Sequence, residues 1–278
     1  MKIKKIGILV AAGVLAAALG LFGCSSSSSS SSSAQSAASS SSATTTSAGY
    51  TLQKAGTLTI ATSPDFPPFE NLENGQYVGL DIEIGKAVAE KLGLTPEFKT
   101  LQFDAILPAI AAGGQADCGI SGFTVDPERE KTVDFSDSYY IDDQAIAVMK
   151  DSSFTSEGID SQLNNANVTI AVQSGTSGEE YVQENYPNAK CQAYGNSTDA
   201  FAAMQAGQAN AVCTNKAVVQ NMLADAYSDA QIVKNVATGE EYAIAVSKDN
   251  PQLTAAIDQA LKELKDDGTI DSLINEYL

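Results

Sequence analysis

From residue 50 onward, short apolar runs rich in β-branched residues alternate with longer segments in which apolar side chains recur at helical spacing. The short runs predict strands at 57–62, 97–100, 116–120, 168–173, 191–194, 211–213 and 242–246. The longer segments predict helices at 81–92, 103–112, 178–186, 198–207, 216–226, 252–265 and 270–277. This alternation is typical of an α/β fold with mostly parallel sheets flanked by helices.

Two halves of the chain repeat the same order of elements. In each half a strand opens into a polar loop, at 59–69 and at 169–179, and a later helix ends in Ala-Gly before a short strand. The pattern AxxAGxQAxxxC recurs at 109–118 and 203–213, with an offset of one residue. Two similar lobes predict a ligand cleft where the carboxyl ends of their strands meet.

The first 49 residues have a different pattern. Residues 1–23 combine a lysine-rich start with an apolar run at 6–22, which predicts a signal peptide that takes no part in the fold. The run ends in Leu-Phe-Gly before Cys24, which resembles the lipobox of bacterial lipoproteins and implies cleavage there and lipid attachment to the sulfur. A signal anchor that is never cleaved is the alternative. Ser, Ala and Thr dominate 25–49, so 24–49 is expected to form a lipidated, flexible tether.

The composition narrows the function classes. Without residues 1–23, 13 basic side chains face 34 acidic ones, a net charge of about −21, which argues against binding to nucleic acid or to anionic lipid. The chain has no histidine and no CxxC spacing, so no metal site, cofactor or thiol catalysis is expected. Cys118, Cys191 and Cys213 are interpreted as small buried apolar residues, and a 191–213 disulfide stays open.

Arg129 is the only arginine of the chain, and it follows a glycine-and-hydroxyl segment that contains Gly122 and Thr124. A guanidinium group binds a carboxylate through two parallel hydrogen bonds, which a lysine cannot do. The alternative is a surface arginine in a charged turn, because charged residues flank it at 128–131.

Six segments resemble, in order, the landmarks of the polar amino-acid family of bacterial extracellular solute-binding proteins, family 3. They are TSPDFPPFE at 62–70, GLDIEIGKAVAEKL at 79–92, FDAILPAI at 103–110, SGFTVDPERE with VDFSDSYY at 121–140, VQSGTSGE at 172–179, and DGTIDSLINEY at 267–277. The resemblance covers nearly all of 50–278 and implies a two-lobe, periplasmic-binding-protein-like fold of type II.

The resemblance also implies boundaries and a role. Lobe 1 would span 50–142 and 239–278, and lobe 2 would span 143–238, with a two-segment hinge near 141–145 and 238–242. The implied protein is a monomeric, lipid-anchored receptor outside the cytoplasm that hands an amino acid or related small carboxylate to an ABC importer permease. It would not be an enzyme. A sensor or adhesin, or a cyclohexadienyl-dehydratase-like enzyme, are the alternatives, and the lack of histidine argues against the enzyme.

By the same resemblance, the candidate ligand-binding residues form two groups. Those expected to meet the ligand α-carboxylate are Arg129, Thr124, Gly122, Ser121, Thr176 and Ser177. Those expected to flank the ligand side chain are Phe66, Phe103, Ser63 and Gln173, although the two phenylalanines could instead be core. The absence of an acid or lysine at Ser63 and Gln173 favours a neutral polar or aromatic ligand.

Asn215 departs from the family pattern, which places an aspartate there for the ligand ammonium. An amide can accept a hydrogen bond but brings no charge. Three interpretations stay open: an amino acid held by Asn215 and a carbonyl, a ligand without an α-ammonium, or another acid in this role. Asp65 and Glu70 are the acids nearest to the predicted cleft by sequence.

Overall fold

The computed structural model describes residues 44–45 and 49–278. The predicted signal peptide, Cys24 and most of the predicted tether lie outside the described residues. Within the predicted tether, strand β1 (Thr44–Thr45) pairs antiparallel with β2 (Thr51–Leu52). In the part of the chain that the structure describes, no helix is long and apolar enough to cross a membrane.

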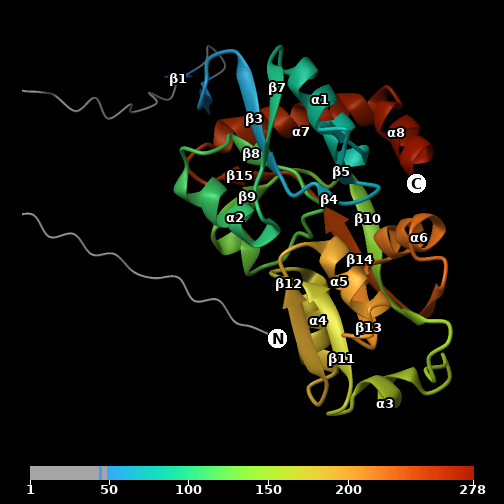
Figure 1. The fold of residues 1–278 in the computed structure, drawn as a ribbon. Helices are drawn as coiled ribbons and strands as arrows, with labels where there is room; N and C mark the ends of the chain where they lie inside the picture. The colour runs from blue at the N-terminus through green and yellow to red at the C-terminus, as the bar shows by residue number, and fades with distance from the viewer. Residues whose placement is uncertain (1–43, 46–48) are drawn as a thin grey trace, which may run out of the picture. The chain divides into compact units, whose positions relative to one another are not determined.

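A five-stranded sheet forms the centre of lobe 1. Its strands are, in spatial order, β7 (Thr95–Thr100), β3 (Thr57–Thr62), β8 (Cys118–Gly119), β15 (Ala245–Ser247) and β9 (Val133–Phe135). Strand β3 runs parallel to β7 and β8, whereas β15 is antiparallel to both of its neighbours. The helices of this lobe are α1 (Leu80–Lys91), α2 (Phe103–Ala112), α7 (Pro251–Asp266) and α8 (Thr269–Tyr277) (Figure 1).

A second five-stranded sheet forms the centre of lobe 2. Its strands are, in spatial order, β12 (Lys190–Tyr194), β11 (Thr169–Gln173), β13 (Ala211–Asn215), β10 (Tyr140–Met149) and β14 (Ala230–Tyr242). Strand β11 is parallel to β12 and β13, and β10 is antiparallel to β13 and β14. The helices here are α3 (Ile159–Leu163), α4 (Ser177–Asn185), α5 (Ser197–Gln205) and α6 (Lys216–Asp225).

Two smaller elements complete lobe 1. A three-stranded antiparallel sheet of β4 (Asp65–Phe66), β5 (Glu70–Glu73) and β6 (Gln76–Val78) precedes α1, and a short 3₁₀ turn, η1 (Arg129–Lys131), precedes β9. The chain passes between the lobes along β10 and β14, which pair antiparallel from Tyr140 opposite Tyr242 to Met149 opposite Ala230 (Figure 1). The two crossings therefore lie side by side.

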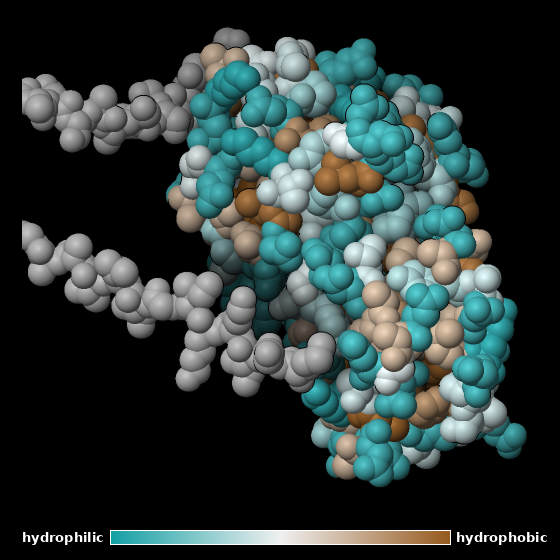
Figure 2. Space-filling view, viewed as in Figure 1, coloured by the Kyte–Doolittle hydropathy of each residue, from teal (hydrophilic) through white to brown (hydrophobic). Residues whose placement is uncertain are grey.

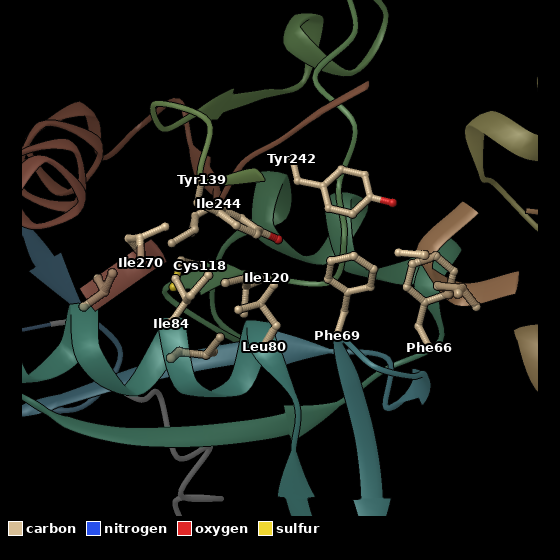
Figure 3. Close-up of a cluster of buried hydrophobic side chains, with 14 of the residues drawn as sticks. Phe66, Phe69, Leu80, Ile84, Cys118, Ile120, Tyr139, Tyr242, Ile244 and Ile270 are labelled. Atoms are coloured by element: carbon tan, nitrogen blue, oxygen red, sulfur yellow. The ribbon is translucent and has the colours of Figure 1, made fainter. Parts of the chain in front are cut away.

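Aromatic residues join the first loop of lobe 1 to both crossing strands. The ring of Phe69 lies 5.8 Å from that of Phe66, 5.4 Å from that of Tyr140 and 5.2 Å from that of Tyr242, measured between centroids. Figure 3 shows Phe66, Phe69 and Tyr242 beside aliphatic side chains of the lobe 1 core, such as Leu80 and Ile120. Outside the core, hydrophobic side chains form small separate patches on the face seen in Figure 2. Tightly packed rings have little room to move, so these contacts hold the first loop of lobe 1 against both crossing strands.

The predicted two-lobe α/β fold is confirmed, and the ends of most predicted elements agree within two residues. The prediction of one strand over 242–246 is wrong. Strand β14 ends at Tyr242 and β15 begins at Ala245, because the chain moves from one sheet to the other at this point. Sequence patterning did not predict β10, β14 and the small β4–β6 sheet, whose strands carry many polar residues.

Candidate functional site

Nine of the eleven predicted ligand-binding residues surround one narrow cleft of about 10 Å³. They come from both lobes and are Phe66, Phe103, Gly122, Thr124, Arg129, Gln173, Thr176, Ser177 and Asn215. The other two, Ser63 and Ser121, do not line the cleft but are bonded to each other, since the Ser63 N–H donates to Ser121 Oγ at 3.1 Å. The two lobes are closed on each other, because hydrogen bonds join them beside the cleft, from Arg129 to the Gly175 carbonyl and from the Gln173 amide to Asp65.

Arg129 is a cleft residue rather than a surface arginine, because its side chain is only 10% exposed. Its Nη1 donates to the Thr124 carbonyl oxygen at 2.8 Å, and its Nη2 reaches across the cleft to the Gly175 carbonyl oxygen at 3.0 Å. The Nε lies 3.0 Å from Asp126 Oδ2, and the guanidinium carbon lies 5.8 Å from the centre of the Phe103 ring. These contacts hold the planar fork in one orientation at the boundary of the lobes.

Glu240, near the end of β14, is a residue of this site that sequence reasoning missed. It is 8% exposed. Its Oε2 accepts hydrogen bonds from the hydroxyls of Thr124 and Ser177, both at 2.7 Å, and from the side-chain amide of Asn215 at 3.1 Å. Its Oε1 accepts from the side-chain amide of Gln144 at 2.9 Å. Three predicted cleft residues therefore converge on one carboxylate.

Two buried carboxyl groups support the loop that carries Ser121 and Gly122. The Ser121 hydroxyl donates to Glu70 Oε1 at 2.6 Å, while the Gly122 N–H and the Tyr139 hydroxyl donate to Asp81 Oδ2 at 2.7 and 2.8 Å. Burial raises the pKa of Glu70 well above its ordinary value and raises that of Asp81 to about 6. Glu70, a sequence candidate for the ammonium site, thus lies behind the loop and does not line the cleft.

Asp65, the second such candidate, links the lobes beside the cleft. Its Oδ1 accepts from the Ser63 hydroxyl at 2.7 Å. Its Oδ2 accepts from the Ser197 N–H at 2.5 Å and from the Gln173 amide at 3.1 Å. Burial raises the pKa of the Asp65 carboxyl. Ser63 and Gln173 are therefore both bonded to Asp65, which is not among the residues that line the cleft.

The N-terminus of α4 faces the cleft at Thr176 and Ser177. The Thr176 hydroxyl caps the helix, because it accepts from the Glu179 N–H at 3.2 Å and donates to the Gln173 carbonyl at 2.8 Å. The Ser177 hydroxyl instead donates to Glu240. A helix N-terminus that is open to the cleft favours negative charge there.

Phe66 and Phe103 line the cleft and also pack into the core, so both interpretations of these rings hold in part. Phe66 is 6% exposed and Phe103 is 8% exposed. Phe66 stacks on Phe69, and Phe103 stacks on Phe123 with ring centroids 4.9 Å apart. The rings give the cleft apolar walls held in place from behind.

A larger hollow of about 630 Å³ lies between the β4–β6 sheet, α6 and α8, and it contains no predicted site residue. Its charged lining residues are the acids Glu73, Asp225 and Glu276. A carboxylate ligand does not suit this hollow, because like charges repel.

The three cysteines of the described region are free thiols, so no 191–213 disulfide is formed. Cys118 and Cys213 are buried, and burial raises the pKa of both, while Cys191 is partly exposed with a pKa raised to about 11 for the same reason. Among residues 49–278, no three His, Cys, Asp or Glu side chains come together as a metal site.

Comparison with known proteins gives a consistent result. The sequence profile of the bacterial extracellular solute-binding proteins, family 3, matches residues 58–278. The putative ABC transporter arginine-binding protein 2 of Escherichia coli (strain K12) is 30% identical over 83% of this chain and 95% of that protein. The arginine-binding extracellular protein ArtP of Bacillus subtilis (strain 168) is 34% identical over 79% of this chain and 85% of its own length.

Solved structures agree with these matches. An ancestral arginine-binding protein bound to arginine superposes with a TM-score of 0.74 and 38% identity, over 80% of this chain and 98% of its own. The ancestral amino acid-binding protein AncCDT-1, a precursor of cyclohexadienyl dehydratase, gives a TM-score of 0.72 and 37% identity, over 80% and 95% of the two chains.

Proposed function

The chain belongs to the bacterial extracellular solute-binding proteins, family 3, and on this premise we propose that it captures an α-amino acid between its lobes and delivers it to an ABC importer. Its relatives are amino-acid-binding proteins of ABC transporters. The ligand would lie in the cleft around Arg129, with its carboxylate on the guanidinium fork.

The observation that carries the proposal is the donor set around Arg129. A guanidinium that is 10% exposed, two hydroxyls and the N-terminus of α4 meet at one place. All of these groups favour a carboxylate. Arg129 now donates to backbone carbonyls of Thr124 and Gly175, and a ligand carboxylate would offer a stronger, charged acceptor to the same N–H groups.

The proposed movement is a rotation of one lobe against the other. We take lobe 1 as 50–142 and 239–278, lobe 2 as 143–238, and the hinge as the paired crossings near 141–145 and 238–242. The register of β10 and β14 shifts between Asp142 and Gln144, inside this hinge. An irregular ladder bends more readily than a regular one, which favours closure here.

The proposed location rests on the sequence of residues 1–49. We propose that Cys24 carries a lipid and that 25–49 tethers the receptor outside the membrane, where it works as a monomer beside its permease. The proposal includes no enzymatic activity. General acid–base chemistry needs a side chain that can exchange a proton at the reacting atoms, such as His, Asp, Glu, Lys, Tyr or Cys. None of the nine residues that line the cleft is of these types, and Glu240 already accepts four hydrogen bonds.

A thermal-shift screen with the twenty common L-amino acids tests the proposal. At least one should raise the melting temperature in a concentration-dependent way, since a ligand at 100 times its Kd stabilises the folded state by about 2.7 kcal/mol. Arg129→Met should abolish the shift, and Lys131→Met, on the exposed side of the same loop, should retain it. Absence of a shift with every amino acid, or a shift that persists in Arg129→Met, would contradict the proposed function.

A further inference from the structure

The carboxylate of Glu240 lies directly behind the cleft, bonded to the lining residues Thr124, Ser177 and Asn215, and a carboxylate-binding site alone does not use its negative charge. Glu240 is 8% exposed, and no ion pair among residues 49–278 includes it. Its partners are two hydroxyls and two amides, which are all neutral. A buried charge without a counter-charge is costly, so a cation that arrives at this position gains a strong interaction.

The guanidinium of Arg129, which lines the cleft, lies close to the Glu240 carboxylate behind it. Arg129 donates to the Thr124 carbonyl, while the Thr124 hydroxyl donates to Glu240, so one residue connects the two charged groups. Thr124 thus joins the guanidinium of Arg129 to the carboxylate of Glu240. Two opposite charges this close together match an α-amino acid, whose carboxylate and ammonium are attached to the same carbon atom.

From this arrangement, and resting on the proposed function, we propose that Glu240 accepts the α-ammonium of the ligand and thereby selects amino acids over other carboxylic acids. Asn215 then serves as a positioning residue, because its amide holds Glu240 Oε2 at 3.1 Å. Gln144 holds the other oxygen at 2.9 Å.

The hydrogen bonds explain how ligand entry would proceed. The hydroxyls of Thr124 and Ser177, which lie 3.4 Å apart, both donate to Glu240 Oε2 at 2.7 Å. A hydroxyl rotates freely, so both can turn to donate to the ligand carboxylate. The ammonium then takes their places on Oε2, while the two amides stay. Each donor lost by Glu240 is replaced by a charge-assisted one, which is stronger than a neutral one.

The test is the affinity of a matched pair of ligands for Glu240→Gln. The pair is the best-binding of the twenty L-amino acids and the carboxylic acid of the same skeleton that lacks the α-ammonium, both titrated calorimetrically. Glu240→Gln should weaken the amino acid about 10-fold to 100-fold, the loss of one charged hydrogen bond. It should change the affinity for the other acid by less than about threefold. Glu241→Gln, an exposed neighbour with the same loss of charge, should change neither.

A rescue variant separates a ligand contact from a structural role. In Glu240→Gln/Asn215→Asp, a carboxylate returns about 3.1 Å from its original place, and the preference for the amino acid should return with it. If Glu240→Gln does not fold, Glu240→Asp keeps the charge and should keep the preference.

Equal weakening of both ligands, or no weakening of either, would overturn the role of Glu240 while leaving the carboxylate site intact. A wild-type protein that binds neither ligand would instead contradict the proposed function.

Discussion

Arg129→Lys is the substitution that tests the carboxylate site most sharply, because it keeps the charge and removes the fork. The arginine makes two hydrogen bonds to carbonyls on opposite sides of the cleft, and its Nε pairs with Asp126. A lysine presents a single ammonium at the end of a flexible chain, so it cannot pair with Asp126 and also hold a ligand carboxylate through two parallel bonds.

The size of the effect follows from the contacts that are lost. A bidentate carboxylate that becomes monodentate loses one charge-assisted hydrogen bond, worth about 2 kcal/mol, which corresponds to about a 30-fold increase in Kd. The unfolding free energy without ligand should fall by about 1–2 kcal/mol, because a bond to the Thr124 or Gly175 carbonyl is lost at a side chain that is only 10% exposed.

Calorimetric titration gives the change in Kd, and urea unfolding gives the change in stability. The control is Lys131→Arg, a change of the same two residue types in reverse at a side chain that is 65% exposed, and it should alter stability by less than about 0.5 kcal/mol. An Arg129→Lys protein that is folded and binds the ligand as tightly as the wild type would refute the bidentate grip.

Three further predictions concern the pH response, closure and location. Burial raises the pKa of Glu70 well above its ordinary value and that of Asp81 to about 6. The folded state therefore binds more protons than the unfolded state, and the unfolding free energy falls as pH rises from about 4 through 6 and beyond. Glu70→Gln should therefore be more stable than the wild type at pH 8 and about equal at pH 4 in urea unfolding, and an unchanged pH profile would contradict this. Gly175→Ala should weaken ligand binding at least tenfold, because the added methyl group would lie 2.9 Å from a side chain of α2 across the cleft. The control is Gly207→Ala, at a glycine with a similar φ and free space around it. This control should lower only the stability, by about 1–2 kcal/mol. Cys24→Ser should move the protein from the membrane fraction to the medium or periplasm, and retention in the membrane would contradict lipidation at this residue.

The fold was predictable from sequence because strands and helices of lobe 1 and lobe 2 have distinct hydrophobic periods. The position of the cleft was predictable because ligands bind at the carboxyl ends of parallel strands. Gln173 and Asn215 end two neighbouring parallel strands, β11 and β13, at the same edge of one sheet. The family resemblance supplied the order of the landmarks, and the family match confirms it.

Glu240 was not predictable from local pattern. It is followed by a second glutamate, Glu241, and the side chains of neighbouring residues in a strand point to opposite faces. Which of the two glutamates bonds to the residues that line the cleft depends on the register of β14 against β10, which shifts between Asp142 and Gln144. Such a shift is set by tertiary packing and leaves no signal in hydrophobic periodicity.

The central claim is that this cleft holds an amino acid by both of its charged groups. A crystal structure with the best-binding amino acid of the screen tests it most directly. The account predicts both carboxylate oxygens on the Arg129 fork, the hydroxyls of Thr124 and Ser177 turned towards them, and the ammonium on Glu240. A ligand seated in the 630 Å³ hollow beside α8, or one with its ammonium away from Glu240, would contradict it.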